Sequence, residues 1–369
     1  MCISCISFPQ PDGERRSGSF SRRSVLTGIG GVAASIALGA CTASPSTQAK
    51  LGVVLLGTQG GPPIDPTRTG ISTALLVDGR TYIVDCGRAS ATQYVRGGLK
   101  LDSIAGMFIT HLHADHIADY YNFFLLGGSA PNNLNDHITR PINVYGPGPA
   151  GGLPPKFGGG TAPTVNPQDP TPGLADLTQR CHDAYAYSTN LFMRDSGVAD
   201  PRTLAAVHEV RVPDMGASPT NTAPRGRPFP VMVDDRVRVT ATLVPHGPVF
   251  PSFAFRFDTE HGSVTFSGDE TYNDNLIDLA HGTDMLIHEA INITAKVPPA
   301  LQDHLLKSHV DVRQVGGIAQ RAEAKHLVLS HIGDLGKTPL DAEQWRRWAM
   351  QGYDGKVTVG EDLQTFRLA

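Results

Sequence analysis

Four residues that can bind a metal ion lie within a stretch of six, directly after an apolar run of the kind that forms a buried strand. The stretch is His111-Leu112-His113-Ala114-Asp115-His116, and the run before it is Gly106-Met107-Phe108-Ile109. On a helix only residues three or four apart share a face, so the first two histidines would point apart there. On a turn that leaves a strand, those two imidazoles can converge on one cation while the last two ligands face a second. The spacing therefore predicts a metal site. Its imidazole and carboxylate ligands suit zinc, and they would also serve iron or manganese.

Three further candidate ligands each follow an apolar strand later in the chain. They are His246 after Leu243-Val244-Pro245, Asp269 after Phe266-Ser267-Gly268, and His331 after Val328-Leu329-Ser330. Taken singly, each could be an ordinary polar residue at a strand end. Taken with the first stretch, all seven lie where loops leave the same edge of a sheet sandwich, and ligands from distant segments can meet there.

The elements that must position these residues are short strands alternating with helices, which indicates a sheet covered by helices on its outer face. Strands are expected at 51–57, 72–77, 81–85, 101–110, 141–146, 236–244, 252–258, 263–267, 284–288 and 326–330, followed by two short terminal strands. Helices are expected at 89–97, 117–126, 174–196, 274–280, 310–322 and 341–351. The aromatic residues of the segment 117–126 are expected in the core.

Residues 127–233 interrupt this rhythm with a long Gly/Pro-rich segment and a helix. We expect them to form an inserted lid over the site within a domain at 51–369, because long loops in compact domains are usually functional. The segment carries eight basic and eight acidic residues, and a neutral lid is poorly suited to following a phosphate backbone. The whole chain has a formal net charge of -4, which predicts no general attraction to nucleic acid or to anionic membranes.

The first forty residues have the layout of an export signal. A twin-arginine pair, Arg22-Arg23, precedes a weakly apolar run that ends at Leu38-Gly39-Ala40-Cys41. Residues 1–40 are therefore expected to be a signal and 41–50 a tether, with the protein lipid-anchored at Cys41 in the periplasm or on the cell surface; an ordinary cleaved signal is the alternative. Removing residues 1–40 takes away four basic and two acidic residues and leaves a net charge of -6. Cys86 and Cys181 then remain, and two buried thiols are favoured over one disulfide.

The order of the metal-ligand motifs resembles the metallo-β-lactamase superfamily, and within it the branch of ribonuclease Z and the alkyl- and arylsulfatase-like hydrolases. The motifs are the stretch 111–116, His246 followed by Phe253–Phe257, Ser267-Gly268-Asp269, and His331, and they span essentially the whole predicted domain. The resemblance implies an α+β fold, a four-layer αβ/βα sandwich with a two-metal site along one edge.

The resemblance also implies roles for the candidate ligands. It assigns seven ligands to two zinc ions joined by a bridging carboxylate: His111, His113 and His246 for the first ion, Asp115, His116 and His331 for the second, and Asp269 between them. The bridging carboxylate argues against antibiotic hydrolysis. Mn²⁺ or Fe²⁺ could replace zinc.

Two cations about 3.5–4 Å apart can share a water, lower its pKa from about 15.7 to about 7, and thereby provide hydroxide at neutral pH. They also stabilise the charge that builds on a tetrahedral centre. Asp115 is counted among the catalytic residues as well as among the ligands. His309, expected at the start of a helix, is the candidate general acid, and Glu289 is expected to orient it. For His309 and Glu289 a capping or buried hydrogen-bonding role is the alternative.

These inferences favour an exported binuclear zinc hydrolase, a metal-dependent enzyme of the arylsulfatase-like type that cleaves small sulfate or phosphate esters. The expected partner is a small anionic ester, nucleic acid is not expected as a partner, and a dimer is compatible with the sequence. The alternatives are a ribonuclease Z-like endonuclease that processes the 3′ ends of precursor tRNA, a lactonase, and an anchored metal-binding protein without catalysis.

Overall fold

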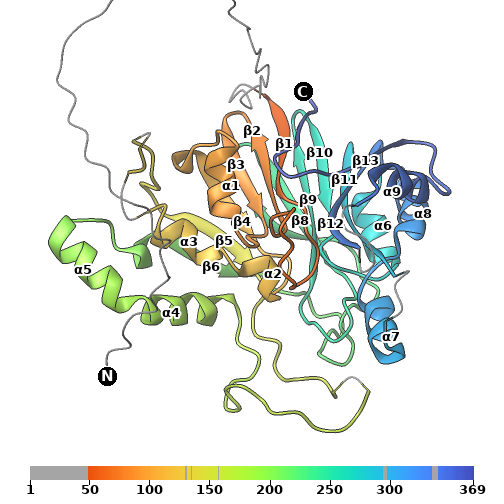
Figure 1. Ribbon diagram of the computed structural model, residues 1–369, viewed down its shortest axis with the longest axis horizontal. Coiled ribbons are helices and arrows are strands. Elements are labelled where there is room, and N and C mark those ends of the chain that lie inside the picture. The colour runs from red at the N-terminus through yellow and green to blue at the C-terminus, as the bar shows by residue number, and fades with distance from the viewer. Residues whose placement is uncertain (1–48, 129–130, 134, 157, 294–296, 335–339) are drawn as a thin grey trace, which may run out of the picture. The chain divides into compact units, whose positions relative to one another are not determined.

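Two seven-stranded sheets form the centre of the protein (Figure 1). The computed structural model describes residues 49–369 apart from 129–130, 134, 157, 294–296 and 335–339. In order across the first sheet, the strands are β14 (Thr365–Arg367), β1 (Leu51–Gly57), β2 (Ser72–Val77), β3 (Arg80–Val84), β4 (Ile104–Phe108), β5 (Ile142–Gly146) and β6 (Ala205–Glu209). Those of the second are β13 (Lys356–Val359), β12 (His326–Asp334), β11 (Met285–Asn292), β10 (Gly262–Phe266), β9 (Phe253–Thr259), β8 (Val237–Leu243) and β7 (Phe229–Val233).

Helices pack on the outer face of each sheet (Figure 1). They are α1 (Ser90–Arg96), α2 (Ala114–Ile117), α3 (Tyr120–Leu125), α4 (Leu174–Ala184), α5 (Ala186–Ser196), α6 (Asp274–Ala280), α7 (Pro299–Ser308), α8 (Val312–Arg321) and α9 (Ala342–Ala349), with short 3₁₀ turns at Leu101–Ser103 and Pro201–Thr203. Of these, α5 extends away from the sheets. One apolar cluster joins α1, α3 and α4 to the first sheet, and another joins α6, α8 and α9 to the second. The expected α+β four-layer sandwich is therefore confirmed.

A third apolar cluster lies between the sheets and fixes the strand that leads into the ligand stretch. Phe108, the last residue of β4, is fully buried, and its ring lies 5.6 Å from that of Phe255 and 4.9 Å from that of Phe257. Such edge-to-face aromatic pairs stabilise a core beyond their buried area. Because Phe108 is held by the opposite sheet, the loop that follows it has a fixed starting point.

Strand direction brings the ligand-bearing loops to one edge of the sandwich. β3, β4 and β5 are parallel, so their carboxyl ends lie at the same edge of the first sheet. In the second sheet β8 and β10 are both antiparallel to β9, and β10 is parallel to β11 and β12, so these four strands point one way. The Phe253 amide donates to the Thr110 carbonyl at 3.0 Å and joins the two sheets at this edge.

Several expected elements differ from those observed. The helix expected at 117–126 is two helices, α2 and α3, and α2 begins at Ala114. The helix expected at 174–196 breaks at Tyr185 between α4 and α5, and the sequence pattern missed β6, β7 and α7. The expected hairpin of β2 and β3 is confirmed, and Tyr120, Tyr121, Phe123 and Phe124 are buried in the core as expected.

The range expected to be a lid, 127–233, is not one continuous insertion. Its strands β5 and β6 extend the first sheet, and β7 edges the second. What projects from the sheets is the segment 147–204, made of a long loop, α4 and α5 (Figure 1). The lid role itself stays a prediction.

The expected signal and the lipid-anchor cysteine, Cys41, lie outside the described residues. Among the residues described, no helix is both long enough and apolar enough to span a membrane. Cys86 and Cys181 are free thiols, as favoured, although Cys86 is buried and Cys181 only half-buried.

Candidate metal centre

All seven predicted ligands converge at the edge where the loops leave the two sheets. His111 and His113 lie on the turn after β4, and Asp115 and His116 lie in α2 directly after it. His246 follows β8 and Asp269 follows β10. The residues form two overlapping groups, and Asp269 is the member that both share.

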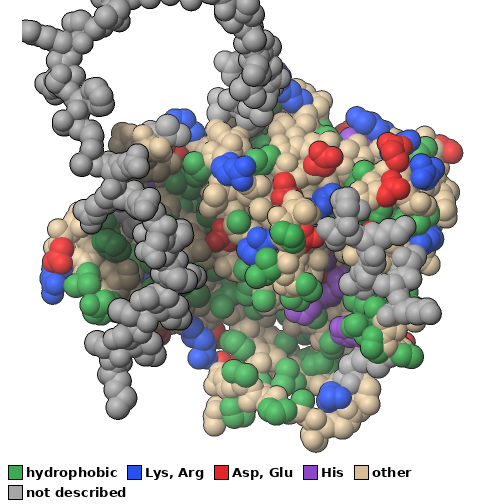
Figure 2. All heavy atoms as spheres, in the orientation of Figure 1, with side chains coloured by type: hydrophobic (Ala, Val, Ile, Leu, Met, Phe, Trp, Pro, Cys, Tyr) green, Lys and Arg blue, Asp and Glu red, His purple; other side chains and the backbone are tan. Residues whose placement is uncertain are grey.

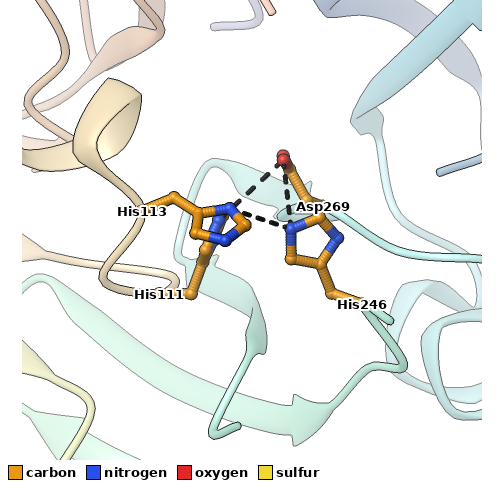
Figure 3. Close-up of side chains that lie close together, drawn as sticks. All are labelled: His111, His113, His246 and Asp269. Atoms are coloured by element: carbon orange, nitrogen blue, oxygen red, sulfur yellow. Dashed lines mark hydrogen bonds and ion pairs between the residues drawn. The ribbon is translucent and has the colours of Figure 1, made fainter. Parts of the chain in front are cut away.

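The first group consists of His111, His113, His246 and Asp269, whose side chains turn towards a common point in Figure 3. The Asp269 Oδ2 atom lies 3.9 Å from His111 Nε2 and 3.8 Å from His246 Nε2. His246 Nε2 lies 3.1 Å from His113 Nδ1. His113 is exposed and the other three are buried, so the group is open on the side of His113.

The second group consists of Asp115, His116, His331 and the shared Asp269. His331 Nε2 lies 3.2 Å from Asp269 Oδ2 and 3.3 Å from Asp115 Oδ2. His116 Nε2 lies 3.4 Å from Asp269 Oδ1. Both oxygens of Asp269 thus face ligand nitrogens, which is the arrangement that a bridging carboxylate requires.

His331 reaches this group because β12 contains a β-bulge. The expected strand ends just before His331, but β12 continues through it to Asp334. Pairing between β11 and β12 shifts between His288 and Ala290, and His331 has a positive φ of 49°. A bulge redirects the side chain of the extra residue, so His331 points to the metal edge rather than along the normal alternation of the strand.

The donor atoms fit metal ions better than they fit hydrogen bonds to one another. His111 Nε2, His116 Nε2, Asp115 Oδ1 and Asp269 Oδ1 are buried atoms without a hydrogen-bond partner among the described residues. An unpaired buried polar atom costs about 1–3 kcal/mol, so four in one place call for a bound ligand. Bonds of about 2.0–2.1 Å to a tetrahedral ion place two ligand atoms about 3.3–3.4 Å apart, close to the separations observed.

Burial and charge keep His111, His246 and both carboxyls in the forms that bind cations. Burial lowers the pKa of His111 well below its usual value and that of His246 to about 3, so both imidazoles are neutral. Burial opposes ionisation of Asp115 and Asp269, yet neighbouring His116 and His331 hold the pKa of both carboxyls below its ordinary value. Neutral imidazoles and ionised carboxylates are the ligating states. His116 differs: burial lowers its pKa, but Asp269 and Asp85 outweigh burial and raise it well above the usual value, so a metal ion has to displace a proton there.

Asp85 is a site residue that the sequence did not reveal. Its Oδ2 lies 2.9 Å from His116 Nδ1, and its Oδ1 accepts a hydrogen bond from the Thr110 amide at 2.8 Å. A carboxylate on the far nitrogen of a ligating histidine fixes the ring and its tautomer. The available signal was that Asp85 directly follows β3, whose carboxyl end lies beside that of β4.

Two backbone groups complete the support of the ligands. The Ser308 carbonyl lies 2.6 Å from His246 Nδ1, which leaves Nε2 facing the site. The Gly61 amide donates to Asp115 Oδ2 at 3.1 Å. Gly60 beside it has no room for a side chain, because an added Cβ would lie 2.8 Å from the Nδ1 atom of His331. The two backbone hydrogen bonds, unlike the glycine at position 60, leave no signature in residue type.

His309 and Glu289, the predicted general acid and its orienting partner, lie together next to the second group. His309 Nδ1 lies 3.0 Å from Glu289 Oε2 and 3.9 Å from Asp269 Oδ2. Burial disfavours the protonated ring, but Glu289 outweighs it and the pKa of His309 rises to about 9. His309 directly follows the end of α7, so the expectation that it begins a helix was wrong. Glu289 does lie beside it, as the orienting role requires.

Comparisons with known proteins agree with this geometry. A family model described as anti-Pycsar protein Apyc1 matches residues 68–122. Ribonuclease Z of Mycolicibacterium paratuberculosis is 29% identical over 313 residues, which cover 84% of this chain and 96% of the relative. Human tRNase Z, short form, superimposes with a TM-score of 0.57 at 23% identity, covering 86% of this chain and 99% of that one. The metallo-β-lactamase fold protein YhfI from Bacillus subtilis gives 0.55 at 17% identity, covering 86% and 98%.

The predicted resemblance is confirmed: the chain has the metallo-β-lactamase fold and is similar over most of its length to proteins named Ribonuclease Z. The expected enzyme class, a metal-dependent hydrolase of ester bonds, is confirmed as well.

The expected substrate was wrong. The relatives are named for ribonuclease and tRNase activity, which overturns the arylsulfatase-like reading, the small anionic ester as partner and the exclusion of nucleic acid. The exclusion relied on an acidic net charge. Net charge is a sum over the whole surface, whereas binding depends on the local groups that meet the ligand.

Proposed function

We propose that this protein is a ribonuclease Z-like phosphodiesterase that cleaves precursor tRNA at its 3′ end and uses two zinc ions. One observation carries the proposal. Seven side chains that can bind metals form two groups that share Asp269. They do so on a fold shared with human tRNase Z, in a chain that covers 96% of a relative named Ribonuclease Z. Two-metal sites of this kind serve in-line displacement at phosphorus.

The bound ions would supply a water of lowered pKa and would neutralise the charge that develops on the phosphate oxygens. The first ion would be held by His111, His113 and His246 and the second by Asp115, His116 and His331, with Asp269 between them. Asp85 and the Ser308 carbonyl hold His116 and His246 in place before substrate arrives. A preorganised site of this kind needs little rearrangement during the reaction.

The proton for the leaving group comes from His309 in this proposal. Its raised pKa keeps the ring protonated at neutral pH, and Glu289 holds the ring through Nδ1, which leaves Nε2 to face a leaving oxygen. A positioned general acid contributes about 10²–10⁴-fold to a rate.

Incubation of the zinc-loaded full chain with a precursor tRNA that carries a 3′ trailer tests the function directly. We expect one cut, with product ends mapped by sequencing, and a rate that falls steeply as salt rises because phosphate contacts release counterions. A mature tRNA without a trailer serves as the control. An enzyme that hydrolyses a simple phosphodiester but leaves the precursor intact would remove tRNA processing from consideration.

Metal content tests the two-zinc part of the proposal separately. We expect about two zinc ions per chain by mass spectrometry, in line with two-metal sites. The variants His246→Ala and His331→Ala are each expected to lose about one ion, because they belong to different groups. A single ion in the unmodified protein would contradict the binuclear assignment.

Export by the twin-arginine route is proposed from the sequence of residues 1–40 alone. Replacing the pair by lysine, Arg22→Lys with Arg23→Lys, is expected to retain the protein in the cytoplasm in cell fractionation. The neighbouring pair Arg15-Arg16 provides the matched control, since the same change there is expected to leave export intact. If both double variants were exported to the same extent, Arg22-Arg23 would not be an export signal.

A further inference from the structure

A cavity of about 400 Å³ opens beside the first metal group. Its walls come from the ligand loop and α2 at 112–117, from residues 147–154 and 170–177 of the projecting segment, from Pro219, and from residues 248–251 after His246. In Figure 2 hydrophobic side chains surround the histidines that reach the surface in the lower half of the view. Small-molecule sites usually measure about 300–1,000 Å³, so the cavity can hold part of a substrate.

The lining of this cavity is apolar and short of donors. It contains seven prolines, together with Leu153, Val249 and Phe250, and no Asp, Glu, Lys or Arg is among its described lining residues. Proline has no backbone N–H, so these walls offer rigid apolar surface rather than hydrogen bonds. A phosphate or sulfate group would find nothing here to neutralise its charge.

The cavity lies directly beside the metal centre. His113 lines it and also lies 3.1 Å from His246 in the first metal group. His113 is the exposed ligand of that group, so the cavity and the metals share an open face. A group seated in the cavity would therefore lie close to a phosphate held at the metals.

We propose that this cavity binds one unstacked nucleobase of the nucleotide that flanks the scissile phosphodiester. The inference rests on the proposed phosphodiesterase function and adds a specificity pocket to it. A nucleobase is a flat, uncharged group, joined through its ribose to the phosphate, and it can bind by packing its face against apolar walls. Since the walls are poor in donors, recognition depends on the face of the base and not on its hydrogen-bonding edge. The pocket therefore accepts any base and rejects an abasic site.

Binding measurements test this without requiring turnover. Isothermal titration of the zinc-loaded full chain with AMP, CMP and ribose 5-phosphate compares ligands that share the phosphate and sugar and differ in the base. We expect AMP and CMP to bind at least about tenfold more tightly than ribose 5-phosphate, in the range found for stacking of one base. Equal affinities for AMP and ribose 5-phosphate would overturn the proposal.

Two variants locate the effect. Ala150→Trp fills the cavity from its wall and is expected to lower AMP affinity to the level of ribose 5-phosphate, while Ala184→Trp, at an exposed position of α4, keeps the full preference.

Leu153→Ala is expected to reduce the preference for AMP over ribose 5-phosphate by a smaller factor. Its side chain is already 56% exposed, so the change does not endanger the fold. Val165→Ala is the matched control at 91% exposure. A preference that survives Leu153→Ala and Ala150→Trp undiminished would place the base elsewhere.

The two proposals fail in different ways. A preference for AMP in a protein that does not cleave precursor tRNA would leave the pocket in place and remove the tRNA substrate. Cleavage of precursor tRNA by a protein that binds AMP and ribose 5-phosphate equally would do the reverse.

Discussion

The metal centre and the projecting segment 147–204 are built in opposite ways. Most ligands of the centre are buried, with His111 fully enclosed and Asp269 only 2% exposed, and their far atoms are held by Asp85 and by backbone groups. In the projection, α4 is tied to the first sheet through Leu174, but α5 has no buried residue and extends from the sheets in Figure 1. Tyr187 of α5 is 82% exposed. The residues proposed for the chemistry are therefore held in place by the core. The residues of the projecting segment are exposed, and substitutions there would change the fold little.

The largest effect is expected at the residue that the two metal groups share. Asp269→Ala removes the carboxylate whose two oxygens face both groups, so we expect phosphodiesterase activity to fall by at least about 10³-fold, as in losses of key electrostatic groups. Circular dichroism should show the fold retained. Asp235→Ala, whose carboxylate is 72% exposed, is the matched control and should keep normal activity. An active Asp269→Ala enzyme would refute the bridging role.

A smaller loss of activity is expected when the proposed proton donor is replaced and the metal ions remain bound. His309→Gln should lower kcat by about 10²-fold without loss of zinc, because general acids contribute at this level. A substrate whose leaving group needs no proton, such as a p-nitrophenyl phosphodiester, should lose much less. His281→Gln, at an exposed position after α6, is the control. Equal losses on both substrates would exclude a proton-donor role.

The support of the ligands is expected to matter less than the ligands. Asp85→Asn keeps the shape of the side chain but removes the charge beside His116, so zinc affinity measured by competition with a chelator should fall by about 10–100-fold. Asp102→Asn, with a side chain that is 54% exposed, provides the comparison. Unchanged affinity in Asp85→Asn would show that the backbone alone orients His116.

The smallest effects are expected in the projection. Tyr187→Ala and Phe192→Ala remove side chains that are 82% and 53% exposed, so the free energy of unfolding should change by no more than about 0.5 kcal/mol for each. Phe108→Ala in the core between the sheets should cost about 3–5 kcal/mol. Denaturant titration measures both. A large loss of unfolding free energy in Tyr187→Ala or Phe192→Ala would mean that α5 packs as part of the core.

The two kinds of region also differ in how far the sequence predicts them. The seven candidate ligands could be grouped from the sequence because each lies on, or directly after, a loop that leaves an apolar strand, and strand order brings such ends to one edge. Asp85 escaped notice although it too follows a strand, because a carboxylate that acts through a histidine carries no motif. The strand before His331 was predicted to end at Ser330, whereas β12 continues through His331 to Asp334, since the bulge at His331 depends on the pairing of β11 with β12.

The substrate was predicted wrongly for the same reason, because the groups that meet a substrate come from segments that only the folded chain brings together. The net charge of the chain and the neutral balance of residues 127–233 were taken as evidence against nucleic acid, but a sum over a chain does not say which groups line the opening of the site. The cavity beside His113 is built from five separate segments of the chain, and none of them alone has the sequence of a binding site.

By itself, the sequence determined the class of fold, the metal-dependent chemistry and the identity of the candidate ligands, because residue type and position at strand ends are local properties. Only the tertiary structure decided that Asp269 faces both groups, that Asp85 and the Ser308 carbonyl hold the histidines, and that an apolar cavity opens at His113. Those arrangements depend on contacts between residues tens to hundreds of positions apart, and the chain forms them only when the two sheets pack on a common core.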